Sequence, residues 1–180
     1  MCNLFEALER IGRIRRTGWI MAKIPNDIAE SIAEHTLKTI LITMMICKEA
    51  KCNEEKSVKM ALTHDLPEAL ISDIPKPIKE KINSKDIQQI SLSAFKEIIN
   101  DEELIQIYME YLEGESLEAR IVDLADNIAT YIQSINYRKQ YGIMTEHLKR
   151  IEEHTRVSVY EKAKGLSLNI DEIMKKLIGK

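Results

Sequence analysis

Residues 27–50 read DIAESIAEHTLKTILITMMICKEA, and this stretch decides the fold class. Its apolar side chains recur at every third or fourth position, which is the spacing of one face of an α-helix. That face comprises Ile28, Ile32, His35, Thr39, Ile42 and Ile46. No stretch of the sequence sustains the alternation of apolar and polar residues that is typical of a β-strand. We therefore predict an all-α protein with a buried helix over residues 27–50.

Apolar periodicity and the positions of glycine and proline in the rest of the chain predict seven further helices. Gly114, Gly142 and Gly165 each follow a helical pattern, as expected of residues that end a helix. Pro75 and Pro77 predict an extended break after residue 74. The predicted helices cover residues 2–14, 27–50, 54–66, 85–100, 101–113, 116–141, 144–164 and 169–178. Candidate N-terminal caps are Asn53, Ser84, Ser116 and the pair Asp27 and Glu30.

The composition is that of one globular helical domain. Aromatic residues make up 5% of the 180 residues, hydrophobic residues 44% and charged residues 31%. Few aromatic residues and abundant Leu, Ile, Met and Ala favour helices packed on helices. The sequence contains no linker-like, repetitive or low-complexity segment. We predict a single helical bundle of about six to eight helices over residues 1–180.

Charge and cysteine content narrow the classes of partner and compartment. A net charge of −3 gives no general attraction to a nucleic-acid polymer or a membrane surface. The three cysteines form no CxxC pair, so we expect no disulfide framework and a reducing, cytoplasmic compartment. No signal peptide is evident, and the apolar run Thr39–Cys47 is too short to span a bilayer. The basic cluster of Arg10, Arg13, Arg15 and Arg16 could receive a phosphate group or could be a solvated helix end.

Three segments carry residues of the types that ligate metals. His35 lies on the apolar face of 27–50, where an imidazole needs a partner; alone, it fits a satisfied core histidine better than a ligand. His64 and Asp65 are adjacent, and together offer the nitrogen and oxygen donors that suit a divalent cation. They can converge only if the helix end relaxes, because neighbouring helical side chains diverge by about 100°. Pro67 could help that relaxation.

The helix predicted over 116–141 offers two carboxylates for a fourth ligand. Asp123 shares a polar face with Arg120, with which it can pair. Asp126 shares a small-residue apolar face with Val122 and Ala129, where an anionic group is costly unless a cation or strong hydrogen bonds hold it. We therefore predict that Asp126 points inward and Asp123 lies at the surface.

These motifs, in this order, resemble the HD-domain metal-dependent phosphohydrolases, and within that superfamily the 5′-deoxynucleotidases. The resemblance covers about residues 10–140. It rests on Arg16-Thr17-Gly18-Trp19, Ser31-Ile32-Ala33-Glu34-His35, His64-Asp65-Leu66-Pro67-Glu68, Ser72-Asp73-Ile74-Pro75 and Val122-Asp123-Leu124-Ala125-Asp126. The resemblance implies a single HD domain with residues 144–178 packed on its motif core. It also implies release of phosphate from deoxyribonucleoside 5′-monophosphates.

The resemblance assigns roles to individual residues. It implies that one divalent ion (Co, Mn, Mg, Ni, Zn or Fe) is held by His35, His64, Asp65 and Asp126. It implies acid–base or water-positioning roles for Glu68 and Asp73, a small-molecule nucleotide as partner, and a homodimer. Two positions depart from the pattern of some relatives, since Gly18 replaces an Arg before Trp19 and Ser72 replaces a Gly. We therefore favour Arg16 as the phosphate-binding residue. Trp19 could stack on a base or cover the core.

Three rival functions stay open. A related enzyme could act on another nucleotide, such as a cyclic nucleotide or a nucleoside triphosphate. A non-catalytic nucleotide-sensing or scaffold domain could keep the same helices. A purely structural protein could satisfy the same polar residues with one another, in which case chelation of metal would leave its stability unchanged.

Overall fold

The structure is a computed structural model that describes residues 2–79 and 81–179, and it is all-α over these residues. Its helices are α1 (Leu4–Arg13), α2 (Thr17–Met21), α3 (Ile32–Ala50), α4 (Glu54–Thr63), α5 (Glu68–Ile71), α6 (Lys76–Lys79), α7 (Ser84–Ile98), α8 (Glu102–Glu113), α9 (Leu117–Tyr141), α10 (Glu146–Gly165) and α11 (Ile170–Ile178). One isolated antiparallel bridge joins Arg15 to Ser31. The all-α prediction is confirmed.

The described residues form eleven helices rather than six to eight. The eight helices of nine residues or more coincide with the eight predicted segments, with shifted ends. The extra three, α2, α5 and α6, have four or five residues each, which is too short to show a periodic apolar face. Helix α6 begins at residue 76, so the extended break predicted after residue 74 is shorter than expected.

Helix α3 begins later than predicted because its cap is Ser31. The Ser31 hydroxyl accepts a hydrogen bond from the Glu34 amide at 3.2 Å, and the Glu34 carboxylate accepts one from the Ser31 amide at 2.6 Å. This reciprocal capping box satisfies two amides that the first helical turn leaves unpaired. The predicted cap pair of Asp27 and Glu30 is therefore wrong, and Glu30 has a different role described below.

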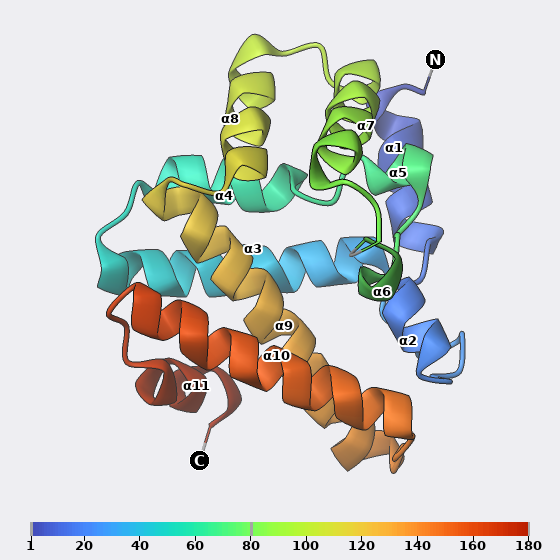
Figure 1. Ribbon diagram of the computed structural model, residues 1–180, viewed down its shortest axis with the longest axis vertical. Coiled ribbons are helices and arrows are strands. Elements are labelled where there is room, and N and C mark those ends of the chain that lie inside the picture. Colours follow the sequence, from blue (N-terminus) through green and yellow to red (C-terminus); the bar gives the residue numbers. More distant parts are fainter. Residues whose placement is uncertain (1, 80, 180) are drawn as a thin grey trace.

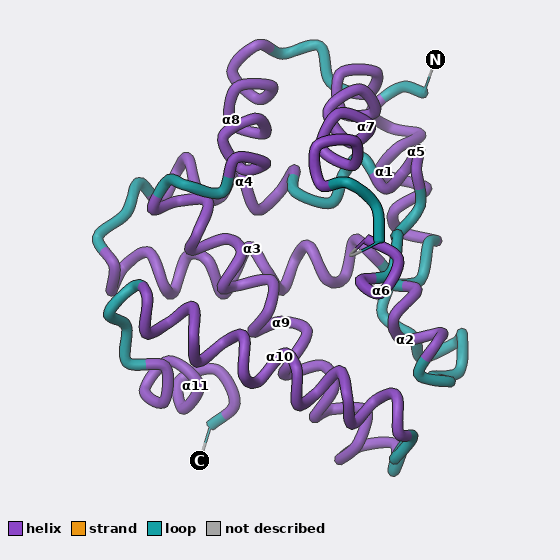
Figure 2. The backbone as a smooth tube through the Cα atoms, viewed as in Figure 1, coloured by secondary structure: helices purple, strands orange, loops and turns teal. Residues whose placement is uncertain are grey.

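Helices α3 and α9 cross at the centre of the molecule, and α10 lies over α9 (Figure 1). The largest apolar cluster joins α3, α9, α10 and α11 through residues such as Ile46, Leu124, Ile128, Val159 and Ile173. A second cluster joins α1 and the start of α3 to α5, α7 and α8. The crossing of α3 and α9 thus lies between two cores, and short loops join the surrounding helices (Figure 2).

Cys47 and Cys52 form a disulfide across the end of α3, which differs from the expectation of no disulfide framework. Lys51 adopts a left-handed conformation with φ of 55°, and this reversal leaves the two Cα atoms 5.0 Å apart. That separation is within the usual range for a bridged pair. Cys2 is a free, buried thiol. No helix in residues 2–79 or 81–179 is long and apolar enough to cross a membrane.

Candidate functional site

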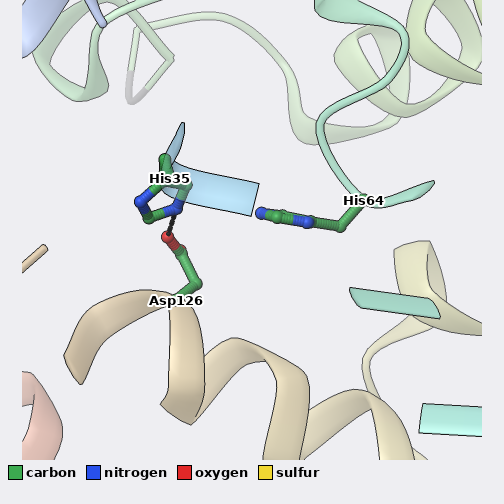
Figure 3. A group of neighbouring side chains, drawn as sticks. All are labelled: His35, His64 and Asp126. Atoms are coloured by element: carbon green, nitrogen blue, oxygen red, sulfur yellow. Dashed lines mark hydrogen bonds and ion pairs between the residues drawn. The ribbon is translucent and has the colours of Figure 1, made fainter. Parts of the chain in front are cut away.

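Three side chains converge where α3, α9 and the end of α4 meet (Figure 3). One potential ligand atom from each of His35, His64 and Asp126 lies within 4.8 Å of the other two. His35 projects from the middle of α3 and is fully buried, and its Nε2 lies 2.7 Å from Oδ1 of Asp126 on α9. The His64 ring points toward this pair from the opposite side (Figure 3).

The ring of His64 is oriented by its own helix. Its Nδ1 lies 2.7 Å from the carbonyl oxygen of Ala61, so Nδ1 carries the hydrogen and donates it. In the neutral ring, Nε2 then carries a lone pair, and this buried atom has no hydrogen-bond partner in the described residues. Oδ2 of Asp65 lies 3.2 Å from it and also offers only lone pairs when ionised. Two acceptors facing each other form a site suited to a cation.

Asp65 extends the cluster toward His35, since its Oδ2 lies 4.0 Å from Nε2 of His35. Burial raises the pKa of Asp65, but the attraction of the His64 and His35 rings when they are protonated, together with that of Arg16, outweighs it and holds the pKa below its usual range. Burial likewise raises the pKa of Asp126, and the hydrogen bond from His35 outweighs it. Both carboxylates are therefore ionised at neutral pH.

The structure separates Asp126 from Asp123 as the helix-face prediction requires. Asp123 lies outside the cluster, with a side chain 46% exposed and an ion pair to Lys162. It also accepts a hydrogen bond from the Asn127 amide group. The partner predicted for Asp123, Arg120, instead donates to the carbonyl oxygen of Gly165 at 2.8 Å.

Arg16, predicted to bind phosphate, lies beside the convergent cluster. Its Nη1 is 2.8 Å from Nδ1 of His35 and 2.9 Å from the hydroxyl of Thr130. Its Nη2 is 3.8 Å from Oδ1 of Asp126, and the side chain keeps 19% of its surface exposed. Burial lowers its pKa, but the carboxylates of Asp126 and Glu30 raise it by more, so the guanidinium is a permanent cation at the rim of the site.

Glu68, the first residue of α5, lies close to the cluster but makes few contacts. The residue is 7% exposed, and its Oε2 has no hydrogen-bond partner in the described residues. Its Oε1 is 3.6 Å from the ammonium of Lys79. Burial, followed by the negative charges of Asp65 and Asp73, raises the pKa of Glu68 well above its ordinary value. In the metal-free chain this carboxyl therefore holds a proton more readily than an ordinary glutamate.

Asp73 reaches the site edge through α2. Its Oδ2 accepts a hydrogen bond from the Thr17 amide at 2.5 Å, and its backbone carbonyl accepts one from the Thr17 hydroxyl at 2.8 Å. Because Thr17 directly follows Arg16, these bonds fix the chain that carries the guanidinium.

Trp19 is 2% exposed and lies in the core cluster of α2, α9 and α10. The centroids of the Trp19 and Tyr137 rings lie 5.2 Å apart with the rings steeply inclined, and Nε1 of Trp19 donates to Oε2 of Glu30 at 2.9 Å. The ring therefore has no exposed face for stacking on a base. Of the two roles left open by the sequence, the structure favours covering the core.

Glu30 is the site residue that the sequence reasoning missed. Its carboxylate is 1% exposed, accepts a hydrogen bond from Lys38 at 2.6 Å, and lies 3.8 Å from Nδ1 of His35. Glu30 lies in the loop before α3, whereas the sequence analysis placed it within the helix predicted over 27–50. The sequence signal that could have identified Glu30 is its position directly before Ser31, a residue type that favours the N-terminal cap of a helix.

The residues of the cluster fit a divalent cation. Two imidazoles and two carboxylates supply nitrogen and oxygen donors without sulfur, a set that suits several first-row ions. The unpaired Nε2 of His64 is the observation that tests the fit, since a buried polar atom without a partner is costly. A cation between His64, Asp65, His35 and Asp126 would remove that cost.

Comparisons with known proteins show which family this chain belongs to. The 5′-deoxynucleotidase hdd1 of Schizosaccharomyces pombe is 27% identical over 145 residues, covering 76% of this chain and 72% of that protein. The human 5′-deoxynucleotidase HDDC2 is 27% identical over 144 residues, covering 75% of this chain and 68% of that protein. A solved structure of a conserved hypothetical protein from Pyrococcus furiosus superposes with a TM-score of 0.73 and 25% identity, covering 97% of this chain and 95% of that one. The model of the HD domain family matches residues 8–166, and the chain therefore belongs to the HD domain family.

Proposed function

We propose that this protein is a metal-dependent phosphomonoesterase that releases phosphate from deoxyribonucleoside 5′-monophosphates. The observation that carries the proposal is the convergence of His35, His64 and Asp126 within 4.8 Å, beside Arg16 and a buried Glu68. The names of the relatives, which are 5′-deoxynucleotidases, support the choice of substrate.

In this proposal His35, His64, Asp65 and Asp126 hold one divalent ion. Such an ion lowers the pKa of a bound water and polarises a phosphoryl oxygen. The donor set admits Co, Mn, Mg, Ni, Zn or Fe, so availability in the cell decides which ion is bound. Loading experiments with single ions would identify those that support activity. The homodimer implied by the resemblance and the cytoplasmic location expected from the cysteine content stay predictions.

Arg16 and Glu68 supply the charges that the hydrolysis of a phosphate monoester needs. The Arg16 guanidinium can donate to two phosphoryl oxygens at once and neutralise them as the P–O bond breaks. The Glu68 carboxyl, buried beside the cluster, can give a proton to the departing 5′-oxygen or orient the attacking water. Asp73 positions Arg16 by holding the amide and hydroxyl of Thr17.

The test is phosphate release by metal-stripped protein to which single divalent ions are restored. The panel comprises deoxyribonucleoside and ribonucleoside 5′-monophosphates, cyclic nucleotides and nucleoside triphosphates. We expect metal-dependent release from the deoxyribonucleoside 5′-monophosphates, with Asp123→Asn as an active control carboxylate on α9. Hydrolysis of only cyclic nucleotides or triphosphates would move the function to the rival enzyme. Nucleotide binding without any release would move it to sensing.

A further inference from the structure

The two histidines of the cluster present opposite nitrogen atoms as hydrogen-bond donors. Arg16 carries only donors, so the Nδ1 of His35 at 2.8 Å must accept from it. The ring hydrogen of neutral His35 then lies on Nε2, which donates to Oδ1 of Asp126 at 2.7 Å. His64 has the reverse arrangement, because its Nδ1 donates to the carbonyl oxygen of Ala61.

His35 therefore lacks the lone pair that a cation beside Asp126 needs. A ring that ligates through Nε2 carries its hydrogen on Nδ1, and a buried N–H requires an acceptor. Arg16 cannot accept, so it must leave Nδ1. A carboxylate oxygen that could accept this hydrogen is Oε2 of Glu30, which lies 3.8 Å from Nδ1.

Glu30 is fixed where such an acceptor is needed. Trp19 donates to its Oε2 at 2.9 Å and Lys38 donates to its Oε1 at 2.6 Å. Lys38 is itself held by the side-chain oxygen of Gln133 at 2.7 Å. The carboxylate is 1% exposed, so water does not compete for it as it would at the surface.

We propose that Glu30 is the positioning residue of His35, accepting the Nδ1 hydrogen when Nε2 turns its lone pair to the metal. The neutral ring keeps one hydrogen throughout, which moves from Nε2 to Nδ1 by exchange with solvent. The same change frees the Arg16 guanidinium from Nδ1 for a phosphate group. This inference rests on the proposed function, because it requires that the cluster hold a divalent ion.

The experiment is calorimetric titration of metal-stripped protein with Zn²⁺, for the native chain, Glu30→Gln and Glu34→Gln. Carboxylates that orient a metal-binding histidine are typically worth 10-fold to 100-fold in metal affinity, so we expect Glu30→Gln to weaken Zn²⁺ binding by about that factor. Glu34→Gln alters a carboxylate of the α3 capping box and is expected to leave the affinity unchanged. Equal affinity of a folded Glu30→Gln and the native protein would overturn the proposal.

A second measurement needs no variant and so stands if Glu30→Gln fails to fold. Long-range ¹H–¹⁵N correlation spectra of the native protein report which ring nitrogen of His35 carries the hydrogen. We expect the hydrogen on Nε2 without metal and on Nδ1 with saturating Zn²⁺. A ring unchanged by saturation would overturn the role of Glu30 while leaving the metal centre intact. No Zn²⁺ binding by the native protein would instead overturn the metal centre and the inference together.

Discussion

The two sides of the candidate site differ in how completely their polar atoms are paired. On the side of α3 and α9, Arg16 contacts His35 and Thr130, and His35 contacts Asp126. On the side of α4 and α5, Nε2 of His64 and Oε2 of Glu68 are buried without hydrogen-bond partners. We refer to these as the paired side and the open side.

The difference shows how a metal site can stay folded before its ion arrives. The paired side neutralises its charges internally, so it adds little unsatisfied polarity to the crossing of α3 and α9. The open side leaves two buried polar atoms, and each costs about 1–3 kcal/mol when it has no partner. We therefore expect that a bound cation gains most of its binding free energy from ligands on the open side. On the paired side it must replace hydrogen bonds that already exist.

The largest expected effect is loss of the open-side ligand. We expect His64→Ala to lose bound metal and to lower kcat/KM for a deoxyribonucleoside 5′-monophosphate by on the order of 10²–10³ or more, the loss typical of one electrostatic group. Metal content by elemental analysis and phosphate release would be measured together. His147→Ala, on α10 outside the cluster, is the control. Full metal content in His64→Ala would show that the open side is not where the ion binds.

The next effect separates the two aspartates of α9. Saturating metal at a hundred times its Kd raises the free energy of unfolding by about 2.7 kcal/mol. We expect Asp126→Ala to lose most of this metal-dependent gain and Asp123→Ala to keep it, because only Asp126 meets His35. Thermal unfolding with and without metal measures the gain. The reverse result, with Asp123→Ala losing metal, would show that the helix-face assignment is wrong.

That assignment indicates how far the sequence predicts this site. Helical periodicity placed His35 and Asp126 inward because both lie within long, regular helices. It placed Glu30 within the helix predicted over 27–50, although that residue lies in the loop before α3. It assigned no face to Asp73, which accepts a hydrogen bond from Thr17, 56 residues earlier. The three short helices were missed for the same reason, since four or five residues show no period.

The Trp19 role was open in the sequence because a lone tryptophan fits a core and a binding face equally well. Only the contacts with Tyr137 and Glu30 decide between them. Periodicity thus placed His35 and Asp126 inward, and the resemblance joined them with His64 and Asp65 into one ligand set. Tertiary contacts were needed for the residues behind that set.

A smaller effect concerns the pH dependence of the metal-free protein. The pKa of Glu68 is higher in the folded protein than the value near 4.5 expected in the unfolded chain. The stability that protonated Glu68 contributes is therefore fully present below the unfolded pKa. It is lost as the pH rises through the folded pKa. We expect Glu68→Gln to remove this loss and to make the metal-free protein more stable than the native chain at neutral pH. Urea unfolding across pH 4–8 measures it.

Glu34 is the control for Glu68, because its pKa is shifted in the opposite direction. Burial raises the pKa of Glu34, but its hydrogen bonds with Ser31 outweigh this and lower it below 4.5. Its stabilising contribution is therefore present above the unfolded pKa and is lost as pH falls. A Glu68→Gln protein that followed the native pH profile would show that the buried carboxyl is not strained by its neighbours.

The smallest effect tests whether the stability of the start of α3 and the position of His35 are independent. Ser31→Ala removes the hydroxyl that caps α3, and loss of such a cap typically costs about 1 kcal/mol of stability. Because His35 lies one full turn beyond the cap and is held by Arg16 and Asp126, we expect metal affinity to change by less than about twofold. Urea unfolding gives the first quantity and Zn²⁺ titration the second. A large loss of affinity would mean that the start of α3 positions His35 directly, so that fraying of the helix and filling of the site are coupled.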